Sequence, residues 1–217
     1  MRRMIPLLVL LFSQLAIAQN SLPEIACEFH TTVTNPRVAQ VRRWQMWRSA
    51  NQVQVRAMDS EEGERWTREA DGRIFYQQVF YSERKTVEFT PGDLAAIHQQ
   101  FEWNKLASLI DPAQLQSQLK KTGEKKTAFG YAVFRYRGRT KNGGMDLWWA
   151  PELQLPVTLR VYNHRRALRT ELKAIHPLSR TPLAQPDLSG FEEIDFADLG
   201  DKESDPFVRR IEHRYHH

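Results

Sequence analysis

The sequence has a single cysteine, Cys27, so its fold cannot depend on an internal disulfide. Small secreted domains usually need such cross-links, whereas a chain of this length can bury a core without them. Lipidation of Cys27 is an alternative, since a small residue, Ala26, precedes it. However, Glu24 stands where a lipidation signal would have an aliphatic residue. A buried, unreactive thiol is therefore the favoured interpretation.

Beyond its first residues, the sequence also lacks any apolar run long enough to cross a bilayer as a helix. Its start is different, because two arginines precede an apolar stretch from Met4 to Phe12, and the small-residue site Ala16-Ile17-Ala18 follows. This is the pattern of a secretory signal peptide. We expect cleavage after Ala18 and a mature protein that is exported to the periplasm.

Motifs for catalysis are absent as well. The sequence contains no Gly-x-Ser-x-Gly, His-Glu-x-x-His, phosphate loop or dinucleotide fingerprint, and its glutamates form no evident pair. Three histidines near the end, His213, His216 and His217, could bind a transition metal, but a solvated chain end is the simpler interpretation. We therefore expect a protein that is not an enzyme and that needs no metal or cofactor.

The charge of the chain is unevenly distributed. Its net charge is +5, yet residues 187–205 hold eight acids and one base. Four arginines crowd one predicted hairpin turn: Arg160, Arg165, Arg166 and Arg169. Such a group forms either a solvated sheet face or a surface that contacts anionic lipid headgroups. Nucleic acid would use the same charges, but export argues against that partner.

Most of the chain has the period of β-strands. Apolar and polar residues alternate repeatedly from Val38 to Phe89, with turn signals such as Asp71-Gly72 between the runs. From Thr90 to Leu119 apolar residues recur every three or four positions, which predicts two or three short helices. Alternation returns from Lys126 to Ile175.

These elements predict one mainly β domain with a helical insertion, spanning residues 19–177. About ten strands form a curved antiparallel sheet, a half-barrel whose concave face is covered by the short helices. Residues 178–217 are predicted to form a Pro- and Ser-rich connector and an acidic tail. Because the tail is too apolar for a solvated linker, we expect it to pack on the domain. Phe191, Ile194 and Phe196 would cover the outer sheet face, where Trp148 or Trp149 could lie beneath them.

Two pairs of tryptophans indicate that both sheet faces carry large apolar groups. Neighbours in a strand point to opposite faces, so Trp148 and Trp149 separate, as do Trp44 and Trp47. We expect one indole of each pair to face inward, and the other to pack under a segment that crosses the outer face. Aromatic residues on the inner face either fill a solid core or line a cavity for an apolar ligand.

The stretch "LWWAPELQLPVTLRV", residues 147–161, resembles the late hairpin of the periplasmic lipoprotein-carrier superfamily, the LolA/LolB-like fold. The order of predicted elements from Val38 to Ile175 is similar to that family too. The acidic tail is not part of the family pattern. The resemblance implies a non-enzymatic carrier that binds a lipid, an acyl chain or a lipoprotein between sheet and helices. A protein of the same fold with a filled core, which docks an envelope partner, is the alternative.

The resemblance also implies site residues. An arginine in the first strands would hold the helical lid, and Arg42 or Arg43 could be its counterpart. The hydrophobic hollow would be lined by a larger set of residues: Trp44, Trp47, Phe134, Tyr136, Trp148, Leu106 and Ile110.

Overall fold

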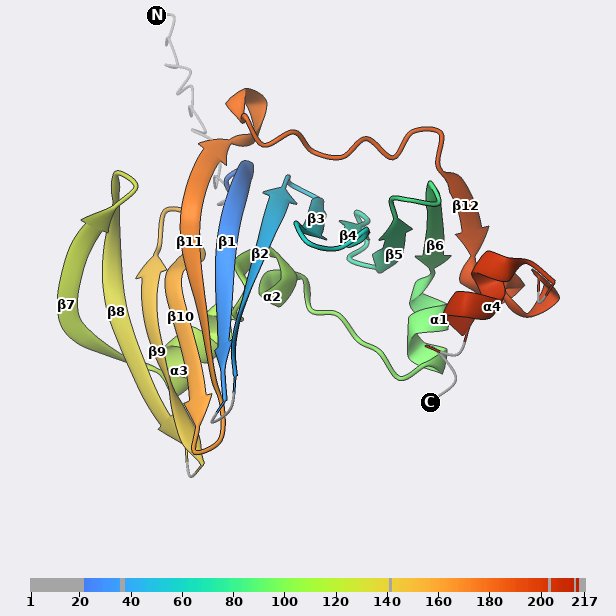
Figure 1. Cartoon of the computed structure of the whole chain (residues 1–217). Helices are drawn as coiled ribbons and strands as arrows, with labels where there is room; N and C mark the ends of the chain where they lie inside the picture. The colour runs from blue at the N-terminus through green and yellow to red at the C-terminus, as the bar shows by residue number, and fades with distance from the viewer. Residues whose placement is uncertain (1–21, 36–37, 141, 203, 213, 215–217) are drawn as a thin grey trace, which may run out of the picture.

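The computed structural model describes residues 22–35, 38–140, 142–202, 204–212 and 214. The expected signal peptide and the three C-terminal histidines lie outside these residues. Within them, one curved open sheet dominates the molecule (Figure 1). The prediction of a mainly β half-barrel with a helical insertion is confirmed.

The sheet has twelve strands, and all neighbours are antiparallel except β12 and β6. The sequence predicted about ten, because β1 precedes the first recognised alternation and β12 lies in the acidic tail. In sheet order the strands are β12 (Glu192–Asp195), β6 (Lys85–Phe89), β5 (Ile74–Phe80), β4 (Glu62–Arg68), β3 (Gln52–Ala57), β2 (Ala39–Arg48), β1 (Ile25–Thr34), β11 (Ala167–Pro177), β10 (Leu155–Asn163), β9 (Gly143–Ala150), β8 (Tyr131–Thr140) and β7 (Lys120–Ala128).

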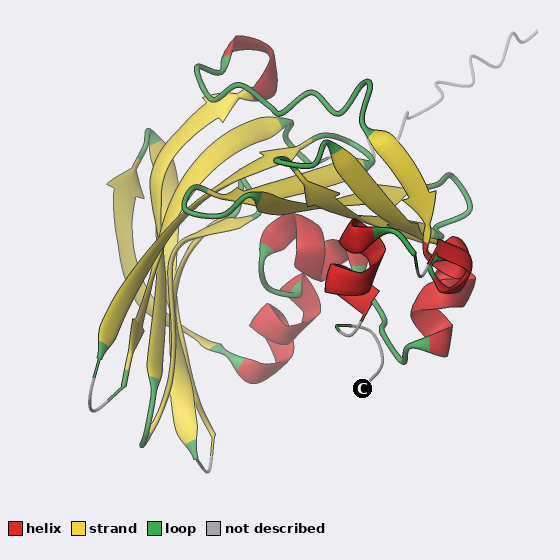
Figure 2. Ribbon diagram, turned by 45° about the vertical axis from the view of Figure 1, so that its right-hand side comes forward, coloured by secondary structure: helices red, strands yellow, loops and turns green. Residues whose placement is uncertain are grey.

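Three short helices between β6 and β7 lie on the concave side of the sheet (Figure 2). Thr90 caps α1 (Pro91–Ala96) through a reciprocal pair of hydrogen bonds with Asp93. After α2 (Trp103–Ser108), the Asp111 side chain accepts a hydrogen bond from the Ala113 amide and begins α3 (Pro112–Gln118). Each helix is too short to be stable alone, so packing on the sheet must hold it.

The concave face is packed in two regions. The larger core, which includes Met46, Val53 and Trp66, lies largely under α1 and α2. A separate cluster joins the region around α3 to β9 and contains Ile110, Leu115, Leu119, Leu147 and Trp149. The helices thus fill much of the curved sheet's inner side.

The sequence predicted that the tail covers Trp148 or Trp149, and this is wrong. Instead β12 pairs in parallel with β6, at the sheet edge opposite the one formed by β7. Ile194 is fully buried there, and Phe196 stacks on Phe89 with ring centroids 4.6 Å apart. An edge strand presents unpaired backbone groups, and β12 provides partners for those of β6. The short helix α4 (Pro206–Glu212) follows, with Phe207 edge-on to Phe80.

The connector between β11 and β12 crosses the outer face of the sheet (Figure 1). It begins with the 3₁₀ turn η1 (Leu178–Arg180), and the tail contains two more, η2 (Phe196–Asp198) and η3 (Gly200–Lys202). Trp47 is 1% exposed, and its Nε1 donates a 2.8 Å hydrogen bond to the Leu183 carbonyl oxygen of this connector. Trp44, by contrast, stacks on Phe29 on the inner face. This pair of tryptophans is divided between the faces as the sequence predicted.

Candidate functional site

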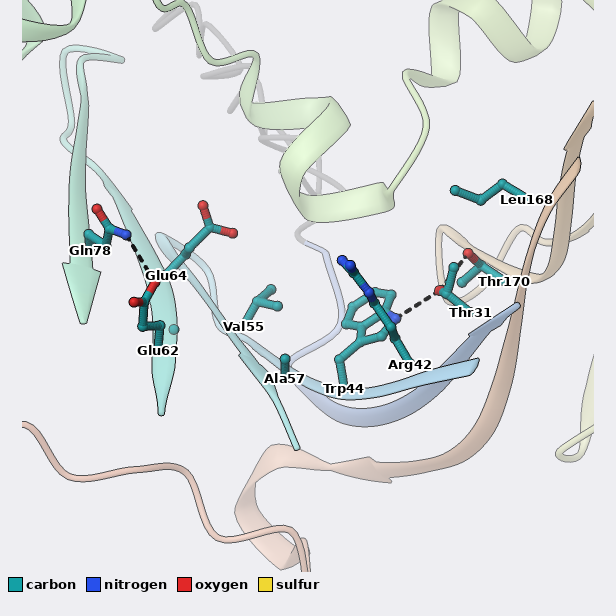
Figure 3. Close-up of a pocket in the computed structure, with 11 residues that line it drawn as sticks. Thr31, Arg42, Trp44, Val55, Ala57, Glu62, Glu64, Gln78, Leu168 and Thr170 are labelled. Atoms are coloured by element: carbon teal, nitrogen blue, oxygen red, sulfur yellow. Dashed lines mark hydrogen bonds between the residues drawn. The ribbon is translucent and has the colours of Figure 1, made fainter. Parts of the chain in front are cut away.

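An open cavity of about 490 Å³ lies on the concave face of the sheet (Figure 3). We call it the concave hollow. Side chains from six neighbouring strands line it, and the labelled ones lie on the side of the sheet that faces a helix (Figure 3). The lining residues are Thr31, Arg42, Trp44, Val55, Ala57, Glu62, Gly63, Glu64, Gln78, Leu168 and Thr170.

Trp44 is the largest residue of the hollow, and its orientation is fixed. The indole stacks on Phe29 with centroids 4.5 Å apart and an interplanar angle of 18°. Its Nε1 donates a 2.9 Å hydrogen bond to Thr31 Oγ1, which lies 2.9 Å from Thr170 Oγ1. Because the polar end of the indole is satisfied within the sheet, its apolar ring is available to the hollow. Val55 and Ala57 continue this apolar floor.

The hollow also carries charge at its walls. Arg42 is exposed and has no ion-pair partner in the described part of the chain. On β4, Glu64 accepts a 3.0 Å hydrogen bond from Tyr76 Oη, and desolvation raises the pKa of its carboxyl. Glu62 binds Arg214 of the tail, with both carboxylate oxygens within 3.0 Å of Nη1. An apolar floor between charged groups suits an amphiphilic ligand.

A buried arginine ties the helices to the sheet above this hollow. Arg48 is 0% exposed, and Nη1 donates a 2.6 Å hydrogen bond to the Ala107 carbonyl oxygen in α2. Nη2 bonds the carbonyl oxygens of Leu153, at 2.7 Å, and Pro23, at 3.0 Å. Burial lowers its pKa to about 10, so it remains charged at neutral pH. Its neighbour Cys27 is buried, and burial raises the pKa of that thiol to about 12.

The sequence resemblance offered Arg42 or Arg43 as the counterpart of a lid-holding arginine, and neither contacts a helix in the described structure. Arg42 lines the hollow, and Arg43 lies on the opposite face because neighbours in a strand alternate. Among the described arginines, Arg48 hydrogen-bonds the backbone of α2, and the Arg68 guanidinium lies 4.6 Å from the ring centroid of Trp103 in α2. Arg48 shares the inner face of β2 with Arg42, six positions earlier. Only tertiary contacts distinguish the two.

Aromatic side chains fill the deep end of the concave face beside the hollow. Phe101, between α1 and α2, lies 5.7 Å from the Trp66 ring and 5.2 Å from the Tyr76 ring, measured between centroids. Trp66 lies on β4 with Glu64, and Tyr76 lies on β5 with Gln78. The Trp66 Nε1 is buried there without a hydrogen-bond partner. The loop between α1 and α2 therefore places Phe101 on the two strands that also line one side of the hollow.

The predicted hollow residues do not all gather in one place. Trp44 lines the hollow, and Trp47 lies on the outer face under the connector. Leu106 packs at the margin of the larger core. Ile110 and Tyr136 belong to the separate cluster around Trp149.

Two other predicted residues lie beneath basic side chains near the β7 edge. Lys121 Nζ is 3.9 Å from the centroid of the Phe134 ring. Trp148 is half-buried, with Lys126 Nζ 4.3 Å from its ring centroid. Most lining residues of the hollow are small or polar, such as Thr31, Ala57 and Glu64, and sequence patterns did not mark them. Only the strand register, which sets them side by side, could have identified them.

The four arginines predicted to contact an anionic surface lie on β10, β11 and their joining turn. Arg160 is paired in register with Arg169, which forms a 2.8 Å ion pair with Glu171. The Asn163 side chain accepts hydrogen bonds from the amides of Arg165 and Arg166, both at 2.8 Å. This fixes the turn, and all four arginines are exposed.

The described residues contain no cluster of three or more His, Cys, Asp or Glu that could hold a metal ion. Nor does any of their helices have the length and apolar character needed to cross a membrane.

The site thus belongs to an open, curved, mostly antiparallel sheet with helices on its concave side. No family model and no curated protein matches the chain. Solved structures of similar fold include PNGF-II, with 12% identity and a TM-score of 0.43 over 82% of this chain and 32% of that one. The complex of MucA and MucB from Pseudomonas aeruginosa gives 13% identity and a TM-score of 0.43, over 72% of this chain and 52% of the other.

A LolA superfamily protein, NE2245 from Nitrosomonas europaea, is also similar, with 8% identity and a TM-score of 0.29. That comparison covers 74% of this chain and 88% of NE2245. The superfamily that the sequence resembles is therefore among the structural neighbours. This chain spans only part of the PNGF-II and MucA/MucB chains, and the similarity concerns the arrangement of elements alone.

Proposed function

We propose that this protein is a non-enzymatic periplasmic carrier that holds the acyl chain of a lipid or lipoprotein in the concave hollow. The observation that carries the proposal is the hollow itself. Its volume of about 490 Å³ falls in the range of roughly 300–1,000 Å³ that is usual for small-molecule sites. Trp44, Val55 and Ala57 give it an apolar floor, and Arg42 offers a cation to an acidic headgroup.

The helical insertion supports this role as a movable cover. Helices α1 and α2 have six residues each and depend on packing for their stability. Phe101 occupies the space over Trp66 and Tyr76 that an acyl chain of greater length would need. In this proposal the chain displaces Phe101, while Arg48 keeps α2 attached to the sheet.

A monomeric fluorescent fatty acid, titrated below its critical micelle concentration, tests the proposal. Ala57→Trp places an indole in the hollow and should weaken binding at least 10-fold, the equivalent of about 1.4 kcal/mol. Ala184→Trp adds the same side chain to the exposed connector and is the matched control, expected to bind as the native protein does. Equal binding by all three proteins, or no binding to any of them, would contradict an acyl-chain site in the hollow.

One observation favours the alternative of an interaction protein with a filled core. Phe101 and the cluster around Trp149 already fill much of the concave face. If that filling is permanent, the fluorescent probe will not bind, and the outer surfaces become the functional ones.

A further inference from the structure

The strand ends that flank three hairpin turns lie at one end of the sheet, the lower end in Figure 1. The register places them side by side: Thr34 beside the β1–β2 tip pairs with Ala167, and Asn163 at the β10–β11 turn pairs with Gly143. Gly143 in turn pairs with Thr140, across the β8–β9 tip. We call the residues at these strand ends the basic rim, because arginines are frequent among them.

The stretches of chain around these three turns lack carboxylates. Asp and Glu are absent from residues 29–58, 125–145 and 153–170, the stretches that contain all three tips. In a chain with 26 acids, this absence restricts ion-pair partners to the margins of these stretches, as in the pair of Arg169 with Glu171. Five of the rim's arginines are exposed and have no side-chain partner within the described residues: Arg42, Arg43, Arg139, Arg165 and Arg166.

The same end also exposes apolar side chains. Val38 is 49% exposed, Val41 is 59% exposed and Val161 is 40% exposed. They account for three of the five large hydrophobic residues that are most exposed in the described chain. Single exposed valines are ordinary, but Val41 and Val161 lie on the strands that carry Arg42 and Arg160, and Val161 lines a cavity.

The concave hollow borders this rim. Arg42 belongs to both, and Leu168 lines the hollow one residue after Ala167, which begins β11. A second cavity, of about 400 Å³, lies on the same end and is lined by Arg139, Val161 and Tyr162 among others. A molecule held against the rim would therefore lie next to both openings.

The charge of the whole molecule is polarised in a way that suits one orientation. The acidic segment 187–205, with its eight acids, includes β12 and leads into α4 beyond the β6 edge, away from the rim (Figure 1). A polarised charge distribution turns a protein toward an oppositely charged partner before contact. Against an anionic surface, the rim would face inward and the acidic segment outward.

We propose that the basic rim docks on the surface of an anionic lipid bilayer, with its arginines among the headgroups and its valines at the level of the first acyl carbons. A bilayer fits better than a folded partner, because the strand ends of three hairpins present a broad edge instead of one groove. This surface goes beyond the acyl-chain site and does not depend on it. Together they would let a chain pass from the membrane to the hollow without crossing water.

Flotation with lipid vesicles tests the proposal on the full chain. Vesicles in which phosphatidylglycerol replaces part of the phosphatidylcholine should bind the protein, and pure phosphatidylcholine vesicles should bind it far more weakly. The double variant Arg165→Gln/Arg166→Gln should lose affinity for the anionic vesicles by roughly 30-fold, because each near-surface cation adds about 1 kcal/mol. High salt should weaken the native protein's binding in the same direction.

The control is Arg180→Gln/Arg209→Gln, which removes the same charge from exposed sites away from the rim. It should bind the vesicles within about two-fold of the native protein, since only charges close to the surface contribute. Equal losses of vesicle affinity in both double variants would overturn the rim proposal, because net charge alone would then explain the binding. Equal binding to neutral and anionic vesicles would overturn electrostatic docking, and tighter binding to duplex DNA than to the vesicles would assign the rim to nucleic acid.

The fluorescent fatty acid separates this proposal from the carrier proposal. Arg165→Gln/Arg166→Gln should bind the monomeric probe as the native protein does, because neither residue lines the hollow. Loss of vesicle binding with intact probe binding supports the rim. Vesicle binding without probe binding would reject the acyl-chain site and keep the rim.

Discussion

The guanidinium of Arg48, on β2, donates a 2.6 Å hydrogen bond to the Ala107 carbonyl oxygen in α2. The same side chain bonds the carbonyl oxygens of Leu153 and Pro23. One buried cation therefore links the sheet, the helical cover and the turn between β9 and β10. Charge-assisted hydrogen bonds are about twice as strong as neutral ones, so this link is central to the cover's position.

Replacing Arg48 with leucine should destabilise the protein by about 3 kcal/mol, because three carbonyl oxygens lose a charged donor. The freed α2 should also let the fluorescent fatty acid dissociate faster. Urea denaturation and stopped-flow dissociation measure the two effects. Arg43→Leu, on the exposed outer face, is the control and should change stability by less than about 0.5 kcal/mol. A native-like dissociation rate in Arg48→Leu would show that Arg48 does not control the cover.

The junction of β12 and β6 should respond to pH. A hydrogen bond with Glu193 raises the pKa of Glu88 from its ordinary 4.5 to about 7, with burial and the charges of Glu193 and Asp195 adding to the effect. Arg65 on β4 opposes the rise. The folded state therefore holds this proton more tightly than the unfolded state, and the resulting stability is complete below pH 4.5 and lost as the pH rises to about 7.

Glu88→Gln should flatten this dependence and stabilise the protein above pH 7 by about 1 kcal/mol, a value kept small because water screens the partly exposed pair. Melting temperatures measured across this pH range provide the test. Glu152→Gln, in an exposed turn, should leave the profile unchanged. A Glu88→Gln profile with the native slope would show that the pair does not titrate as described.

Deletion of residues 191–217 should lower the melting temperature strongly. The described part of this segment buries Ile194, Phe207 and Ile211, and full burial of such side chains stabilises a fold by about 1.5–3 kcal/mol each. It also covers the β6 edge. Since apolar burial dominates, the loss should persist at high salt. A truncated protein that melts with the full chain would show that the tail contributes nothing to stability.

The connector should loosen when Trp47 loses its hydrogen bond to Leu183. Trp47→Phe removes the indole donor and leaves a carbonyl without its partner, at a cost of about 1 kcal/mol. Limited proteolysis within residues 178–190 should become faster. Trp148→Phe, at a half-exposed site under Lys126, is the matched control, expected to leave the cleavage rate unchanged.

Much of the fold followed from the sequence because its signals were local. Asp71-Gly72 and the alternation around it predicted the meander, and Thr90 with Pro91 predicted the first helix. The tail could not be placed in the same way. The apolar residues of the stretch around Ile194 indicated burial, but a four-residue strand that pairs in parallel across more than 100 residues leaves no local pattern.

The candidate site was harder to predict than the fold. Trp44 was identified because a large aromatic residue on an inner face is conspicuous. Ala57 and Glu64 were not, because their role depends on which strands neighbour them. The sequence did not single out Arg48 from Arg42 and Arg43, because all three lie on the same predicted strand. Only the hydrogen bond to Ala107 in the folded structure distinguishes Arg48.

Native mass spectrometry of the protein purified from its own cell envelope tests the carrier proposal most directly. The proposal predicts a mass above that of the polypeptide, an excess that denaturation releases as a lipid or acyl species and that Ala57→Trp abolishes. A mass equal to the polypeptide alone, together with no uptake of the fluorescent fatty acid, would contradict it.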